Sequence, residues 1–150
     1  MRSFFTFLYW VIFKNSKYSQ SNEEELLLDI FKEKPYGFYV DLGCHHPMRF
    51  SNTAMLYKKG WRGINIDANK SNIKLFNVFR RRDINISALV SEHIEKHKYY
   101  YFKDGALNGI LSNSRVEFLE SLNYVNIRSE NILTTTLNDL LSNYDIPNKA

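Results

Sequence analysis

The chain has 150 residues, which suits one globular domain with its own hydrophobic core. Hydrophobic residues make up 44% and charged residues 24%, both ordinary values for a globular protein. The single cysteine excludes a disulfide framework and fits a reducing compartment, so a cytoplasmic location is expected.

The net charge is +4, but the basic residues are scattered and their only run is at positions 80–82. We interpret this run as a solvated helix end, because cations are favourable at that terminus. An anionic partner such as a nucleic acid is the alternative, and no other feature of the chain favours it.

Residues 4–13 are almost unbroken apolar sequence, preceded by Arg2 and followed by Lys14. This stretch is shorter than the roughly 20 residues that span a bilayer, and no small-residue cleavage site follows it, as a signal peptide requires. We interpret it as a helix packed on the domain or on a partner, with an interfacial membrane anchor as the alternative. Residues 1–17 are therefore treated as a separate segment, and residues 18–150 as the domain.

Alternating helix and strand signals follow in chain order. Capping-box spacing at 21–24 predicts a helix from Asn22 that ends near Pro35. A strand is predicted at 38–42, a helix from the caps at 51–53 through Lys59, and a second strand at 63–66. A helix after Asn69, reaching about Arg80, and a third strand at 84–90 complete this half.

This order predicts parallel strands joined by crossover helices, the beginning of a doubly wound α/β sheet. Each of the first two strands ends near an acidic residue, Asp41 and Asp67 respectively. Ligands of such sheets bind at the carboxyl ends of the strands. Because a carboxylate can accept two hydrogen bonds at once, Asp67 suits the hydroxyls of a ribose.

Behind position 90 the pattern changes. Aromatic residues at 99–102 followed by Asp104 and Gly105 predict a strand and a tight turn, hence a β-hairpin. A short helix is predicted at 115–122, a strand at 132–136 and a final helix at 137–141. The closing residues, 144–150, are predicted to be a loop.

A series of short motifs along the chain resembles the FkbM-type S-adenosylmethionine-dependent methyltransferases. The motifs are YSQ at 18–20, GFYVDLGCHHP at 37–47, SNT at 51–53, KGWRG at 59–63, NIDAN at 65–69, RDIN at 82–85, ALN at 106–108 and TTTL at 134–137. No one of them is specific, but their order along most of the chain is.

The resemblance implies the N-terminal half of a Rossmann-like, doubly wound class I methyltransferase sheet with a β-hairpin insertion. It implies S-adenosyl-L-methionine as cofactor and transfer of a methyl group to an oxygen of a sugar, glycan or small metabolite. The implied cofactor residues are Asp41, Gly43 and Cys44 around the methionine part, Asp67 at the ribose, and Ala68 and Asn69 beside the adenosine. His45 and His46 are the implied candidates for a general base.

The family pattern continues into a fourth strand that closes on an Asp-x-Glu-Gly motif, whereas this sequence ends at Ala150. We therefore expect a truncated member of the family. An edge of the sheet left open in this way favours self-association. The expected partners are a small-molecule or glycan acceptor, with peripheral membrane contact through residues 4–13 as the alternative location.

Two other functions compete with this one. A nicotinamide-dependent oxidoreductase would carry a Gly-x-Gly-x-x-Gly loop after the first strand, but residues 41–47 contain one glycine and bulky neighbours. A non-catalytic remnant or interaction module is the alternative from another class.

Four further features of the sequence could be read as functional, and each also has a simpler structural interpretation. The pair His45 and His46 lacks a completing metal cluster, and His93 and His97 have the i, i+4 spacing of a zinc site on a helix but lack a third ligand. No metal site is therefore predicted. Cys44 is interpreted as a small residue that fits its turn rather than a reactive thiol. The aromatic residues at 99–102 are interpreted as the two faces of a hairpin rather than a base-stacking platform.

Overall fold

The computed structural model describes Tyr18 and residues 23–147, and the apolar stretch at 4–13 lies outside them. The fold is mixed α/β and divides into two compact units. One contains the described residues up to Ser87 together with Pro147, and the other is Ala88–Ile146. No helix in the described part of the chain is long and apolar enough to cross a membrane.

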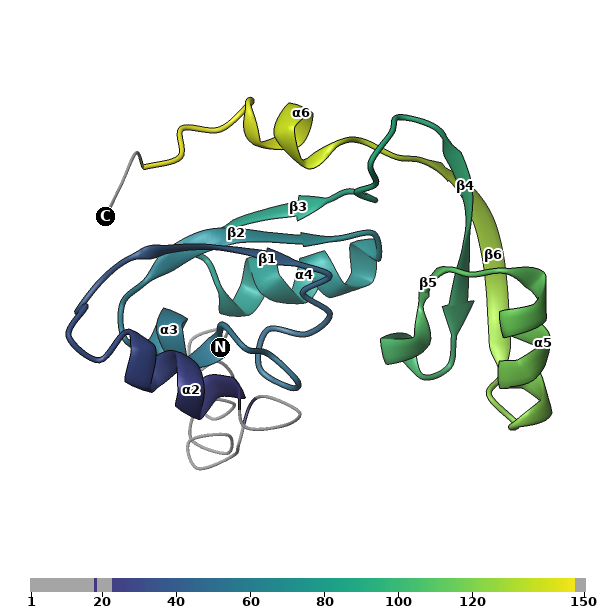
Figure 1. Cartoon of the computed structure of the whole chain (residues 1–150), viewed down its shortest axis with the longest axis horizontal. Coiled ribbons are helices and arrows are strands. Elements are labelled where there is room, and N and C mark those ends of the chain that lie inside the picture. Colours follow the sequence, from purple (N-terminus) through teal and green to yellow (C-terminus); the bar gives the residue numbers. More distant parts are fainter. Residues whose placement is uncertain (1–17, 19–22, 148–150) are drawn as a thin grey trace. The chain divides into compact units, whose positions relative to one another are not determined.

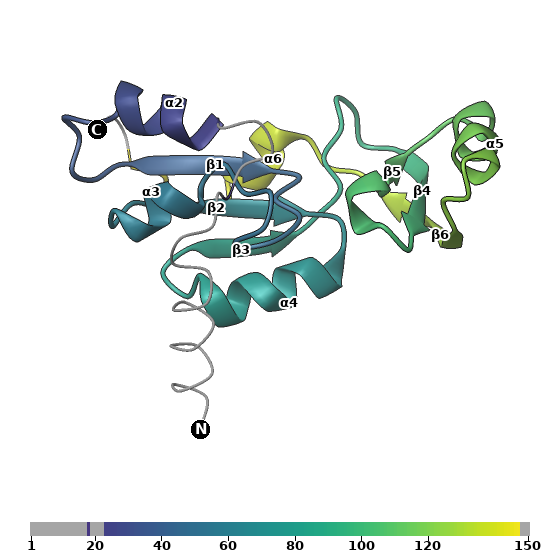
Figure 2. The same ribbon diagram turned by 90° about the horizontal axis from the view of Figure 1, so that it is seen from below.

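The first unit contains a parallel sheet in the order β1-β2-β3. The strands are β1 (Phe38–Leu42), β2 (Arg62–Asp67) and β3 (Ile84–Ser87). Figure 2 shows them side by side with their arrows pointing the same way. The predicted crossovers are confirmed: α3 (Ala54–Lys58) joins β1 to β2, and α4 (Lys70–Phe79) joins β2 to β3. The third strand ends at Ser87, not at position 90 as predicted.

Helices α2 (Glu23–Ile30), α3 and α4 lie on one side of this sheet (Figure 1). That side carries Tyr39, which packs against Leu56 and Trp61, and also Asp41, whose partner Thr53 precedes α3. The opposite face carries the alternate residues of the strands. Its β1 members Val40 and Leu42 are 40% and 54% exposed, while Ile64 and Ile66 of the central strand are fully buried.

Local signals set the helix ends of this unit. Asn69 caps α4 by accepting a hydrogen bond from the Ser71 N–H at 3.0 Å. Gly60, with a φ of 103°, ends the turn after α3, because a side chain there would be strained. Both predicted helices are thereby confirmed.

Tyr18 is built into the first unit by contacts at both of its backbone groups. Its N–H donates to the buried carboxylate of Glu24 at 2.7 Å, and its carbonyl accepts from the Ser51 N–H at 2.9 Å. Its ring packs with Met48 and Ala54, and its hydroxyl contacts the Lys58 ammonium group. Glu24 therefore reaches back to residue 18. The Ser21 half of the predicted capping box lies outside the described residues.

The second unit contains an antiparallel sheet in the order β5-β4-β6. Its elements are β4 (Lys96–Phe102), a 3-10 turn η1 (Gly105–Leu107), β5 (Gly109–Ile110), α5 (Asn113–Ser121), β6 (Asn126–Leu133) and α6 (Leu137–Leu141). The predicted hairpin is confirmed, and its turn is closed by Asn108, whose side-chain oxygen accepts from the Phe102 N–H at 2.8 Å.

A small core holds this second unit together. Tyr100 and Phe102 of β4 pack against Val116 and Leu119 of α5. At the far end of β6, the Thr134 hydroxyl accepts from the Glu95 N–H at 2.9 Å and so ties the segment before β4 to the segment after β6. The strand predicted at 132–136 is corrected: β6 begins at Asn126 and ends at Leu133.

Candidate functional site

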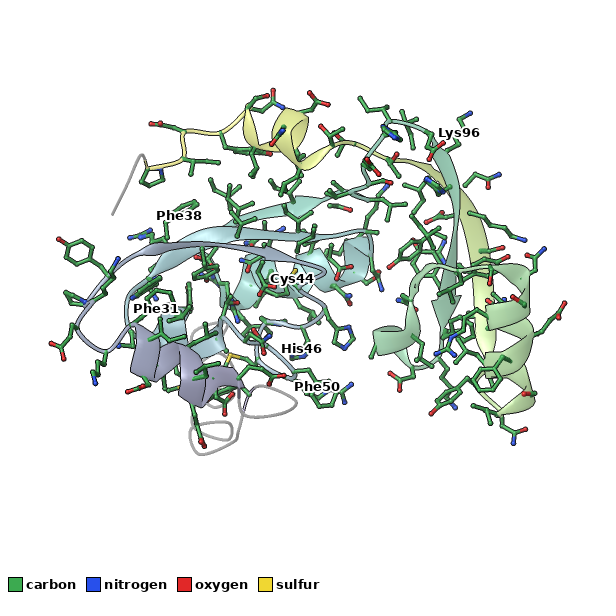
Figure 3. The ribbon with its side chains drawn as sticks, viewed as in Figure 1. Phe31, Phe38, Cys44, His46, Phe50 and Lys96 are labelled. Carbon is green, nitrogen blue, oxygen red and sulfur yellow. The ribbon has the colours of Figure 1, made fainter. Side chains whose placement is uncertain are left out.

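The carboxyl ends of β1 and β2 lie next to each other, because Leu42 is paired with Ile66 in the parallel register. In parallel sheets these ends form the place where ligands bind. The residues that follow are Gly43 to Pro47 after β1, and Ala68 and Asn69 after β2. Figure 3 labels Cys44 beside the sheet, with His46 and Phe50 further along the same loop.

The loop after β1 is held against the end of β2 by backbone hydrogen bonds. The N–H groups of Gly43 and Cys44 both donate to the Ile66 carbonyl, at 2.9 and 3.2 Å. The N–H of the next residue, His45, donates to the Asp67 carboxylate at 2.9 Å. Gly43 has a φ of 73° and His45 one of 50°, so both lie in the left-handed region. Only the first is a glycine, and the second is the kind of outlier that marks functional loops.

Asp67 is the common partner of both loops. It is 8% exposed. Its Oδ1 accepts from the Asn69 N–H at 2.7 Å and from the Asn72 side-chain amide at 3.3 Å, and its Oδ2 accepts from the His45 N–H. A carboxylate offers about four acceptor positions, so Asp67 has one position left, on Oδ2.

No family model, curated protein or solved structure matches this chain.

His46 is held by the loop itself. Its Nδ1 accepts from the N–H groups of Met48 and Arg49, at 3.1 and 2.9 Å. The ring proton therefore belongs on Nε2. Burial first, and then the charges of His45, Arg49 and Arg80, lower the pKa of His46 to about 4. A neutral imidazole whose accepting nitrogen is already occupied is poorly placed to take a proton from a substrate.

His45 differs from its neighbour. Its Nε2 is buried and has no hydrogen-bond partner in the described part of the chain. A buried ring nitrogen without a partner is unusual in native structures. Of the two histidines named from the sequence, His45 is therefore the one whose ring has an unpartnered nitrogen among the described residues.

Cys44 is 3% exposed and packs against Ile73 and Phe76 of α4. Burial, and then the nearby Asp41 and Asp67 carboxylates, raise the pKa of its thiol well above the ordinary value. The thiol stays protonated, which favours the interpretation of a residue that fits its turn over that of a reactive nucleophile.

Asp41 lies one residue before the end of β1, on the helix-covered face. Its Oδ2 accepts from the Thr53 hydroxyl at 2.5 Å. Burial raises the pKa of Asp41, and this hydrogen bond is the largest influence that lowers it. Asp41 is therefore a site carboxylate whose charge depends on its partner.

Arg80 is the residue that sequence reasoning missed. The run at 80–82 was interpreted as a solvated helix end, which is wrong for its first member: Arg80 is fully buried. Arg81 and Arg82 are exposed. The helical period carried the missing signal, because Arg80 follows Ile73 by seven residues and Phe76 by four and so shares their buried face.

The remaining candidates take structural positions. His93 lies in a loop and His97 in β4, where its Nε2 approaches Glu95 at 2.7 Å, so the helical i, i+4 arrangement is not formed. The described residues contain no cluster of three or more potential metal ligands. The four aromatic residues at 99–102 are all buried, which leaves no open ring face for base stacking.

Proposed function

We propose that the first unit binds S-adenosylmethionine across the carboxyl ends of β1 and β2, and that the protein is an FkbM-type methyltransferase. The observation that supports this best is Asp67, a nearly buried carboxylate at the end of the central strand onto which the loop after β1 is folded. The finer fold assignment belongs to the same proposal: the order β1-β2-β3, with α3 and α4 on the crossovers, matches one half of a doubly wound sheet.

The chain's own groups fit this ligand in two respects. A Cβ added at Gly43 would meet no atom within 4 Å, so the space beside this turn is open. Asp67 retains one acceptor position on Oδ2. It gains a second when the long 3.3 Å contact from Asn72 gives way, which allows one ribose hydroxyl on each oxygen.

The loop after β1 favours a cofactor without a diphosphate. Dinucleotide sites place a pyrophosphate on the N-terminus of the helix that directly follows a glycine-rich turn. Here α3 begins only at Ala54, well beyond Gly43. Thr53, at the N-cap of α3, donates its hydroxyl hydrogen bond to Asp41. The nicotinamide alternative therefore has neither the glycines nor the helix terminus that it needs.

When bound, the cofactor supplies a sulfonium methyl group, which leaves sulfur for the acceptor oxygen as the C–S bond breaks and the C–O bond forms. The chain's part in this step is to position the acceptor and to receive its proton. His45 is the residue we assign to that proton, because its Nε2 is without a partner in the described residues. His46 keeps the loop folded.

The experiment is a thermodynamic cycle. Asp67 also holds two loops in place, so its removal alone would weaken the binding of any ligand. Binding of S-adenosylhomocysteine and of its 2′,3′-dideoxy analogue is measured by calorimetry on the parent and on Asp67→Asn. If Asp67 holds the ribose, the parent prefers the hydroxylated ligand by at least about tenfold, in line with charge-assisted hydrogen bonds, and the variant loses most of that preference.

Equal preference in parent and variant would reject the ribose role of Asp67. No binding of S-adenosylhomocysteine by the parent, or tighter binding of a nicotinamide dinucleotide, would reject the proposed function. Asp29→Asn, at an exposed carboxylate of α2, is the matched control and should leave both affinities unchanged.

A further inference from the structure

Arg80 caps α4 and is fully buried, yet each of its N–H donors has an acceptor. Nε and Nη2 donate to the Pro47 carbonyl, at 2.9 and 2.6 Å, and Nη2 also donates to the Ser51 hydroxyl at 2.6 Å. Nη1 donates to the Thr53 hydroxyl at 2.7 Å and to the Tyr39 hydroxyl at 3.3 Å. The guanidinium group therefore binds the segment that connects the loop after β1 to α3.

None of these acceptors is a carboxylate, so the hydrogen bonds that link the buried cation to carboxylates run through hydroxyl groups. Because the Thr53 oxygen accepts from Arg80, its single proton is free to go to Asp41, at 2.5 Å. The Tyr39 hydroxyl accepts from Arg80 in the same way and donates to Asp83 at 2.5 Å. Two hydroxyls thus link one cation to two carboxylates.

The two carboxylates differ in how much they depend on this link. Asp83 also accepts from the Gly63 N–H and from the Asn65 side-chain amide, both at 3.0 Å. For Asp41, the Thr53 hydroxyl is the one hydrogen-bond donor found among the described residues. Asp41 is also the member that lies at the carboxyl end of its strand, in the candidate site.

We propose that Arg80 is a positioning residue which, through the Thr53 hydroxyl, holds Asp41 oriented and ionised so that the site presents a fixed negative charge to a cationic ligand group. This inference rests on the proposed function for the identity of that group, the sulfonium of S-adenosylmethionine. It makes a separate statement about Asp41 that does not need the ligand.

The charges around Asp41 show why the link matters. Burial raises the pKa of Asp41, and the Asp67 and Asp83 carboxylates raise it further. The Thr53 hydrogen bond and the Arg80 charge oppose them without cancelling them, so the pKa of Asp41 stays above its ordinary value. The Cys44 thiol, on the adjoining loop, stays protonated and adds no charge. Without the Thr53 hydroxyl, Asp41 loses the largest influence that favours its ionised form.

The test uses a matched pair of substitutions at one position. Thr53→Val keeps the shape of the side chain but removes the hydroxyl, and Thr53→Ser keeps the hydroxyl. The carboxyl carbon of Asp41 is titrated by NMR in the full chain without ligand. We expect the midpoint to rise by about one pH unit in Thr53→Val, a tenfold change in the ratio of protonated to ionised form, and to stay at the parent value in Thr53→Ser.

The second readout is the affinity ratio of S-adenosylmethionine to S-adenosylhomocysteine, which differ in the charge on sulfur. The parent should lose its preference for S-adenosylmethionine over S-adenosylhomocysteine at the pH of the Asp41 titration midpoint. This pH should be higher in Thr53→Val and unchanged in Thr53→Ser. Unchanged midpoints in Thr53→Val, or equal shifts in both variants, would overturn the inference. Thr53→Ala serves the same comparison if the valine variant does not fold.

The two proposals fail separately. If the parent binds neither ligand, the proposed function falls while the NMR titration still decides whether the Thr53 hydroxyl keeps Asp41 ionised. If both ligands bind but the Asp41 midpoint is the same in all variants, the proposed function stands and the role of Arg80 is rejected.

Discussion

His46 performs the task that asparagine or aspartate usually performs in a turn. Its Nδ1 accepts from the backbone N–H groups two and three residues further on, at Met48 and Arg49. Asn and Asp side chains accept from the same backbone positions in Asx-turns. The ring can do this only while Nδ1 is unprotonated, so the turn after β1 contains a titratable group whose neutral form is the structural one.

This placement sets a pH dependence of stability. The pKa of His46 is lowered to about 4 in the folded chain, against an ordinary value of 6.5 in the unfolded one. The folded state therefore binds fewer protons between these values, and its stability falls as the pH drops from about 6.5 toward 4. His46→Asn should keep the turn and remove this part of the pH dependence, as measured by urea unfolding at a series of pH values.

His93→Asn is the control, because His93 is exposed and its side chain has no such role. If His46→Asn keeps the full acid sensitivity of the parent, His46 is not its source.

At this scale, the sequence analysis identified candidate residues by their chemical type but did not predict which side chains would be buried. Asp67 was predicted from a carboxylate that closes an apolar strand, and the structure places it nearly buried at that point. Arg80 was assigned to a solvated helix end because cations are favourable at that terminus. Its partners, a carbonyl and three hydroxyls, come from positions 39, 47, 51 and 53, and no local pattern could bring them together.

At the scale of single elements, β1 and β2 are joined by a close fit between a ring and a glycine. A Cβ added at Gly63 would lie 2.2 Å from Cδ2 of Tyr39, which is paired with Gly63 across the strands. The Tyr39 ring therefore occupies the space where another residue's side chain would be. This explains the second glycine of the KGWRG motif, Gly63, by packing, with no need for a left-handed backbone.

Gly63→Ala should consequently destabilise the chain by about 1–3 kcal/mol, the usual effect of overpacking. The loss is measured by urea unfolding. Gly109→Ala is the matched control, since its added Cβ would meet only the Leu111 side chain at an ordinary 3.8 Å. Equal stability of Gly63→Ala and the parent would show that Tyr39 moves aside without cost.

The elements themselves were predicted well where apolar spacing was strong. Strand β1 has its predicted bounds, and helix α4 lies where it was predicted, with Ile73 and Phe76 buried at helical spacing. Strand β6 was predicted too short, since its first six residues, Asn126 to Asn131, are mostly polar. That segment is a strand because it pairs with β4 in the antiparallel sheet, a tertiary cause that its own sequence does not carry.

At the scale of the whole molecule, the hydrophobic clusters of the described residues divide between the two units. Three lie in the first unit, one of them around Tyr39, Leu56 and Trp61, and one joins β4 to α5 in the second. The sequence predicted one continuous domain from residue 18 onward. The change of pattern behind position 90 was visible in it, but such a change does not say whether the clusters of the two halves will join.

Separate hydrophobic clusters in the two units predict local effects of core substitutions. Leu119 is 4% exposed in the second unit, and Leu119→Ala should cost about 2–5 kcal/mol there. Amide hydrogen exchange should speed up in β4 and α5 while β1, β2 and β3 keep their protection. Phe118→Ala, at a half-exposed neighbour on the same helix, is the control and should change little. Uniform loss of protection across both sheets would show one cooperative unit.

The hydrogen bonds from Gly43, Cys44 and His45 onto the end of β2 also bear on how fast a ligand can be captured. These amides acquire their partners when the chain folds, with no ligand present. The loop is therefore already ordered before a ligand arrives. Ligand binding then does not include the entropy cost of ordering a flexible loop. Capture at this edge of the sheet should be a single-step encounter whose rate follows ligand concentration without a plateau.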